Sequence, residues 1–97
     1  MIDLDSRNFR QVKEILHRHL PDRPVWVFGS RINGTAKPHS DLDLAILGTE
    51  RVATKILSAL KEEFAASNLP FRVDIVDWNR ISEEFRKIIE KNHLEIG

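Results

Sequence analysis

The sequence predicts an α/β domain in which a small mixed β-sheet is flanked by helices. Two observations predict this class. Amphipathic stretches of helical length alternate with short runs rich in β-branched and aromatic residues, and Gly, Asn or Pro separates most of them. The predicted order is helix, strand, short helix, strand, helix, strand, helix. Alternation of this kind is typical of helices layered against one sheet.

Residues 6–20 are predicted to form the first helix. Its apolar residues recur at steps of three and four, which places them on one stripe: Phe9, Val12, Ile15, Leu16 and Leu20. Asp5 or Ser6 is suited to cap its start, and Pro21 ends it. The first predicted strand follows at residues 24–28, a short apolar run in which we expect Trp26 to pack in the core.

Residues 30–36 are predicted to form a short helix, and Asn33-Gly34 and Lys37-Pro38 mark a loop after it. The second strand is expected at residues 41–47. Residues 50–66 form the next predicted helix, whose core-facing residues we expect to be Val52, Ile56, Leu57, Leu60 and Phe64.

Residues 71–76 alternate as the third predicted strand, and a last helix is expected at residues 82–93, with Phe85, Ile88 and Ile89 facing inward. The long helix between the second and third strands predicts a right-handed crossover, so these two strands should be parallel. The short connection between the first two strands is compatible with an antiparallel pair.

Composition limits the classes of function. The 97 residues predict one domain, residues 1–97, and no apolar run is long enough to span a bilayer. Fifteen basic residues balance fifteen acidic ones, which makes direct nucleic-acid binding an unfavoured interpretation. Cysteine is absent, so a metal ion would need oxygen or imidazole ligands. No secretory signal is visible at the start of the sequence, and we expect a cytoplasmic protein.

Asp41 and Asp43 are the first candidate site residues. Side chains two apart on a strand point to the same face, where two carboxylates repel each other. A divalent cation such as Mg²⁺, or the similar Mn²⁺, relieves this repulsion. An Asp-rich turn at the exposed end of a strand is the alternative.

Gly29, Ser30 and Arg31 lie where the first strand meets the short helix. Glycine allows a ligand to approach the backbone, free N–H groups at a helix start favour phosphate, and Arg31 offers a charged fork that matches phosphate oxygens. A simple strand-ending turn is the alternative. Lys37 and His39, in the following loop, are weaker candidates for a ligand contact.

Asp74 lies in the middle of the third predicted strand, between Val73 and Ile75, where burial is expected. A lone buried carboxylate is costly unless it is paired or bound to a metal. If the third strand lies beside the second, Asp74 joins Asp41 and Asp43 on one surface. A salt bridge to Arg31 or Arg72 is the alternative.

The combined pattern resembles the signature of the DNA polymerase beta-like nucleotidyltransferase superfamily. The resemblance rests on Gly29-Ser30-Arg31, Gly34 and Ser40-Asp41-Leu42-Asp43-Leu44, with Val73-Asp74-Ile75-Val76-Asp77 as the strand of the third carboxylate. It implies that Gly29 and Ser30 hold the triphosphate of ATP, and Arg31 and Ser40 are included among the nucleotide-binding candidates. It also implies that Asp41 and Asp43 bind two Mg²⁺ ions, and that Asp74 binds the metal near the attacking hydroxyl.

Within the superfamily, the small size is similar to that of minimal nucleotidyltransferases, antitoxin-like proteins that act with a HEPN-type partner. The resemblance therefore implies AMP transfer from ATP to a hydroxyl of such a partner, for some members a tyrosine. The sequence contains no tyrosine, so it offers no such acceptor itself. A non-catalytic module that neutralises a partner by contact and an adenylyltransferase of a small-molecule hydroxyl remain the alternatives. The sequence leaves the oligomeric state open.

Overall fold

A four-stranded mixed sheet lies at the centre of the chain. The computed structural model describes residues 2–96. The strands are β1 (Val25–Phe28), β2 (Leu42–Ile46), β3 (Val73–Asp77) and β4 (Leu94–Glu95), in the order β3-β2-β1-β4. The structure confirms the predicted parallel pairing of β2 with β3, and β1 pairs with β2 in the antiparallel direction with which their short connection is compatible. The sequence did not predict β4, because two residues are too short to show a strand pattern.

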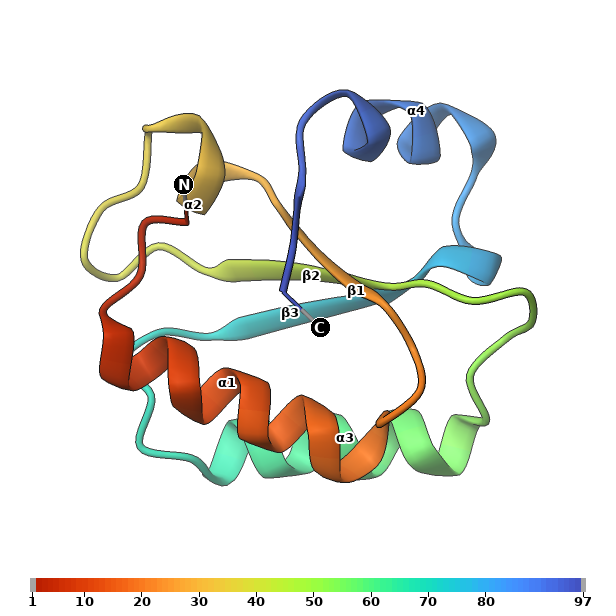
Figure 1. Ribbon diagram of the computed structural model, residues 1–97, viewed down its shortest axis with the longest axis horizontal. Coiled ribbons are helices and arrows are strands. Elements are labelled where there is room, and N and C mark those ends of the chain that lie inside the picture. The colour runs from red at the N-terminus through yellow and green to blue at the C-terminus, as the bar shows by residue number, and fades with distance from the viewer. Residues whose placement is uncertain (1, 97) are drawn as a thin grey trace.

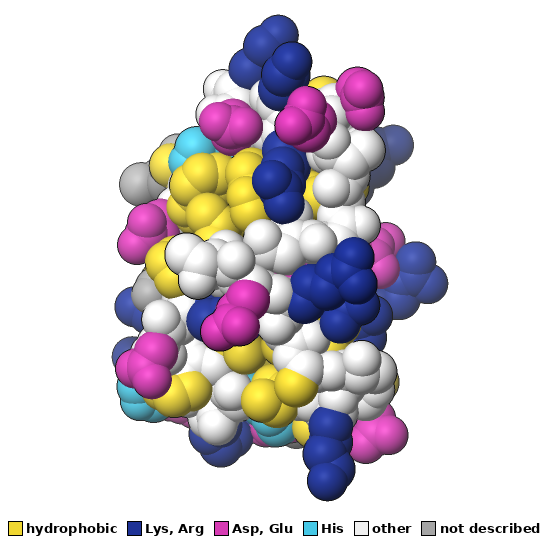
Figure 2. Space-filling model, turned by 90° about the vertical axis from the view of Figure 1, so that its right-hand side faces the viewer, with side chains coloured by type: hydrophobic (Ala, Val, Ile, Leu, Met, Phe, Trp, Pro, Cys, Tyr) yellow, Lys and Arg dark blue, Asp and Glu magenta, His cyan; other side chains and the backbone are white. Residues whose placement is uncertain are grey.

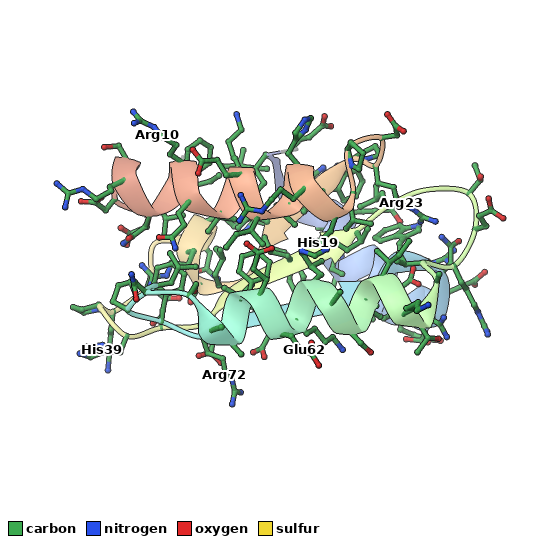
Figure 3. All side chains as sticks on the ribbon, turned by 90° about the horizontal axis from the view of Figure 1, so that it is seen from below. Arg10, His19, Arg23, His39, Glu62 and Arg72 are labelled. Atoms are coloured by element: carbon green, nitrogen blue, oxygen red, sulfur yellow. The ribbon has the colours of Figure 1, made fainter. Side chains whose placement is uncertain are left out.

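Two long helices cover one face of this sheet. Helices α1 (Ser6–His19) and α3 (Thr54–Ala66) run side by side across it (Figures 1 and 3). The hydrophobic core lies between these two helices and the sheet. Its fully buried residues include Val12, Ile15, Val25, Val27, Leu42, Leu44, Ile46 and Leu60. Polar contacts also join the helices, because Glu63 accepts hydrogen bonds from Arg18 and contacts His19 Nε2 at 2.7 Å. Burial of this apolar layer fixes which face of each strand turns away from the helices.

Helix α3 begins at Thr54, later than the sequence predicted. Arg23 donates to the carbonyls of Leu47 (3.1 Å) and Glu50 (2.7 Å), and the Asn79 amide donates to Gly48 (2.9 Å) and Glu50 (3.0 Å). These long-range bonds hold residues 47–51 in an irregular loop. In the predicted core stripe, Ile56 is wrong because it is 40% exposed, and Val52 is buried but lies before the helix.

The opposite face of the sheet is covered at one end by α4 (Glu83–Lys91), which follows the short helix η1 (Trp78–Arg80) (Figure 1). Trp26 was predicted to pack in the core, but it lies outside the main hydrophobic core. It stacks on His93, with centroids 3.7 Å apart, and meets Trp78 edge-on at 5.4 Å. Figure 2 shows hydrophobic surface below the charged side chains of α4. Ile88 was expected to face inward but is 64% exposed, whereas Ile89 is buried.

At its other end, the sheet face opposite α1 and α3 is next to α2 (Ser30–Asn33) and the loop that follows this helix. The second helix is shorter than the predicted 30–36, because Gly34 takes a left-handed conformation (φ 83°) and ends it. None of the helices described between residues 2 and 96 is long and apolar enough to cross a membrane.

Candidate active site

The turn after β1 brings the backbone against a carboxylate. Gly29 has φ 82° and ψ −153°, a conformation that favours glycine. A Cβ atom at this position would lie only 2.4 Å from Asp43 Oδ2, so a side chain at residue 29 would collide with the carboxylate. Ser30 then begins α2, where first-turn N–H groups lack partners within the helix. The Gly-Ser turn and Asp43 therefore form one local unit.

The sheet register aligns this turn with the predicted carboxylates. Phe28 pairs with Asp43 across β1 and β2, and Asp43 pairs with Asp74 across β2 and β3. Asp41 lies just before β2, two residues from Asp43, and so extends towards the same face. The Gly29 turn after β1 thus lies beside Asp43 on β2, and Asp43 lies beside Asp74 on β3, the neighbour expected if the third strand lies beside the second.

The sequence predicted that Asp74 is buried, and this was wrong. Its side chain is 46% exposed and that of Asp41 is 40% exposed. Val73 and Ile75 pack against the core, so the Asp74 side chain lies on the other face of β3, which is the edge strand of the sheet in residues 2–96. Solvent reaches both Asp74 and Asp41 there.

The three carboxylates repel one another. Burial, with smaller contributions from the charges of Asp74 and Asp41, raises the pKa of Asp43 to about 6. Partial burial, a hydrogen bond with Asp41 and the charge of Asp41 also raise the pKa of Asp74, and the guanidinium of Arg72 acts in the opposite direction. Arg72 lies 3.5 Å from both Asp41 Oδ2 and Asp74 Oδ1. One of the predicted alternatives, a salt bridge from Asp74 to Arg72, is therefore present.

The donor chemistry of this site fits a hard divalent cation. All three donors are carboxylate oxygens, the ligands that Mg²⁺ prefers, and their mutual repulsion favours a positive charge. In residues 2–96 no three acidic or histidine side chains already converge around an ion position. Arg72 supplies the positive charge instead, and its side chain is 76% exposed (Figure 3). Few contacts oppose its movement away from Asp41 and Asp74.

Arg31 differs from its predicted role as a phosphate contact. The residue is only 6% exposed, and its guanidinium donates to the carbonyls of Asp3 (3.1 Å), Pro38 (3.2 Å) and Ser40 (2.8 Å). It also lies over the ring of Phe71, 4.7 Å from the centroid. The sequence suggested a phosphate contact because it shows that Arg31 is charged but does not show where its side chain points. In the structure Arg31 anchors the loop that leads to Asp41.

Ser40 is also engaged within this loop. Its hydroxyl accepts a hydrogen bond from the N–H of Lys37 at 2.8 Å, and its own N–H donates to the Lys37 carbonyl. The side chains of Lys37 and His39 are exposed, and His39 points outward at the end of the molecule (Figure 3). The structure thus gathers Gly29, Ser40 and the carboxylates at one end of the sheet.

Asp77, the last residue of β3, has a separate role in the structure. Its buried carboxylate accepts hydrogen bonds from the N–H of Val52 (2.8 Å) and of Asn79 (3.0 Å), and it pairs with Arg80 at 3.1 Å. These contacts join the end of β3 to the loop before α3. Only the three-residue spacing of Asp77 and Arg80 hinted at this pair in the sequence.

The fold and the site define a nucleotidyltransferase. Residues 10–96 match the family described as "Polymerase beta, Nucleotidyltransferase", and the chain belongs to this family. A protein of Haemophilus influenzae (strain ATCC 51907 / DSM 11121 / KW20 / Rd) named "Probable protein adenylyltransferase MntA" is 47% identical over 95 residues, which span 98% of this chain and 83% of that protein. The family predicted from the sequence is therefore confirmed.

Solved structures show the same fold. A chain in a crystal structure of a toxin–antitoxin with AMP-PNP superposes with a TM-score of 0.77 at 23% identity, over 93% of this chain and 73% of the other. A chain in a complex of the tri-AMPylated Shewanella oneidensis HEPN toxin with an MNT antitoxin gives a TM-score of 0.73 at 20% identity, over 97% of this chain and 72% of the other. These similarities establish the architecture, and the site residues above come from this chain alone.

Proposed function

We propose that residues 1–97 form a single metal-dependent domain that transfers AMP from ATP to a hydroxyl of a HEPN-type partner protein, and thereby acts as an antitoxin. The observation that carries the proposal is the row formed by the Gly29 turn, Asp43 and Asp74 on three adjacent strands. The 47% identity to a protein named as a probable protein adenylyltransferase supports the choice of a protein acceptor.

Each residue of the row has a different proposed part. The backbone at Gly29 and the N–H and hydroxyl of Ser30 hold the triphosphate, because the first N–H groups of α2 lack partners within the helix and favour phosphate. Asp41, Asp43 and Asp74 would hold two Mg²⁺ ions, or Mn²⁺, which supply positive charge for the phosphate oxygens and the reacting hydroxyl. Arg31 acts indirectly, by fixing the loop that positions Ser40 and Asp41.

The proposed reaction is an in-line displacement at the α-phosphorus of ATP. The acceptor oxygen forms a bond to phosphorus while the bond between this phosphorus and the bridging oxygen to the β-phosphate breaks. Pyrophosphate leaves, and the hydroxyl proton passes to the carboxylate of Asp74. The protein contributes mainly position and charge, which are the main requirements of phosphoryl-type transfers.

The acceptor is proposed to belong to another protein. The chain contains no tyrosine, and a tyrosine hydroxyl of a HEPN-type partner fits the AMPylated toxin described for a structural relative. ATP and Mg²⁺ are plentiful in the cytoplasm, where we place the reaction.

A labelling experiment tests this function. The chain, its HEPN-type partner and Mg²⁺ are incubated with ATP labelled at either the α- or the γ-phosphate. Label from α-labelled ATP alone should reach the partner, and Asp41→Asn should abolish the transfer. Absence of label in the partner, combined with full neutralisation by a variant in which Asp41, Asp43 and Asp74 are all Asn, would favour the non-catalytic alternative. Label on a small-molecule hydroxyl alone would favour the other alternative.

A further inference from the structure

The outer edge of β3 has unpaired backbone groups. The Leu42 N–H donates to the Arg72 carbonyl at 2.9 Å, and Leu42 is in register with Val73. In a parallel pair this arrangement turns the N–H and C=O groups of Asp74 and Val76 towards β2. Those of Val73 and Ile75 therefore point away from the sheet, along an edge that no strand of residues 2–96 covers.

A groove of about 700 Å³ follows this edge. On the side of α3 it is lined by Lys61, Phe64, Leu69 and Phe71. Its lining continues around β3 to Arg72 and Asp74, which belong to the candidate active site. A molecule in the groove would therefore reach the carboxylate of Asp74 without entering the rest of the site.

The order of the strands gives the direction from which an acceptor arrives. The phosphate-holding turn follows β1, Asp43 lies on β2 and Asp74 lies on β3, and β3 ends the sheet. An in-line displacement needs the attacking and leaving oxygens on opposite sides of the phosphorus. If the triphosphate lies at Gly29, the acceptor hydroxyl must come from the side of β3, which is the open edge.

We propose that the acceptor enters as an extended polypeptide segment that pairs with the open edge of β3 and places its hydroxyl beside Asp74. This inference rests on the proposed function and names the form in which that substrate is presented. Pairing satisfies the free N–H and C=O groups of Val73 and Ile75, as in strand addition to other sheet edges. A residue opposite Asp74 on the added strand has its Cβ about 5 Å from that of Asp74, close enough for a side-chain hydroxyl to contact the carboxylate.

The charge of the groove indicates the kind of segment. Lys61 and Arg72 are its basic residues, while Asp74 faces the reacting hydroxyl. An acidic side chain on the segment complements Lys61. A second copy of this chain fits less well, because the same edge of that copy carries Lys61 and Arg72 and has only Asp74 as an acidic residue of the groove. The occupant is therefore a hydroxyl-bearing, acidic segment of the partner protein.

Amide exchange measures strand addition directly. Exchange of individual backbone N–H groups is followed by NMR in the labelled chain, alone and with the HEPN-type partner, in the presence of Mg²⁺ and a non-hydrolysable ATP analogue. Val73 and Ile75 should exchange quickly in the free chain and slowly with the partner. Asp74 and Val76, already bonded to β2, should be protected in both samples. Unchanged exchange at Val73 and Ile75 on saturation with the partner would overturn the proposal, as would protection that depends only on the concentration of the chain itself.

A matched pair of charge reversals tests the groove. Lys61→Glu changes an exposed residue that lines the groove, and Lys55→Glu changes an exposed residue of the same helix that does not line it. Lys61→Glu should raise KM for the acceptor about tenfold, equivalent to about 1.4 kcal/mol, with KM for ATP unchanged. Lys55→Glu should behave like wild type. Equal kinetics of the two variants would contradict the groove, whereas absence of transfer by wild type would contradict the proposed function itself.

Discussion

Replacing Asp43 by Asn should stabilise the metal-free protein at neutral pH. Burial and the neighbouring carboxylates raise the pKa of Asp43 from 3.8 to about 6. Each pKa unit corresponds to about 1.36 kcal/mol, so the ionised side chain costs at most about 3 kcal/mol. Asp43 is partly exposed, and solvent screening reduces this to about 1 kcal/mol. In a chain of this size the midpoint of thermal unfolding should rise by about 4–8 °C.

The sign of the effect follows from the direction of the pKa shift. A carboxyl whose pKa is higher in the folded state binds its proton more tightly there, so the wild type loses stability as pH rises from about 4 to about 6. The advantage of Asp43→Asn should therefore be largest above pH 7 and disappear near pH 4. Adding Mg²⁺ should stabilise the wild type at pH 8 and the variant less.

Urea denaturation without divalent ions, at several pH values between 4 and 8, measures this difference. Asp22→Asn is the control, because Asp22 is exposed in the turn after α1 and the substitution changes the net charge equally. A variant at residue 43 that is less stable than wild type at pH 8, or that follows the same pH dependence as Asp22→Asn, would refute the repulsion argument. It would show instead that the Asp43 carboxylate helps to hold β2 in place.

Three further predictions concern residues around the site. Gly29→Ala should cost about 1–3 kcal/mol of stability and weaken ATP binding, because the added Cβ would lie 2.4 Å from Asp43 Oδ2 and φ is 82°. Calorimetry measures the affinity for ATP, and an unchanged affinity would contradict the proposed binding of the triphosphate at Gly29. Asp77→Ala should cost about 2–4 kcal/mol in urea denaturation, since it leaves buried N–H donors without acceptors; a loss below 1 kcal/mol would contradict that role. Arg31→Lys should lower stability and transfer together, as a loop anchor requires; a rise in KM for ATP at unchanged stability would restore the predicted phosphate contact.

The sequence predicted those parts of the fold that depend on local periodicity. Helix α1 and the apolar strands were recognisable because their patterns repeat over several residues, and the pairing directions followed from connection length. The late start of α3 was not predictable, because the bonds from Arg23 and Asn79 that hold the preceding loop come from distant residues. The two-residue strand β4 depends in the same way on its partner β1.

The candidate site was predictable in composition and less so in orientation. The spacing of Asp41 and Asp43 fixes their common face, and a parallel third strand brings Asp74 beside them. Burial was harder to predict. Asp74 was expected inside and is exposed at an edge, whereas Arg31 was expected at the ligand and is buried. Which strand forms the edge, and which carbonyls surround an arginine, are decided by long-range packing.

Intact mass spectrometry of the HEPN-type partner shows directly whether this chain transfers AMP to it. The partner is incubated with the chain, ATP and Mg²⁺, and its mass is compared with that of a sample containing Asp74→Asn. We expect one or more added AMP groups with wild type and none with the variant, and calorimetry should show that the variant still binds both ATP and the partner. An unmodified partner in the wild-type sample, despite a stable complex, would contradict the claim that this chain is an adenylyltransferase.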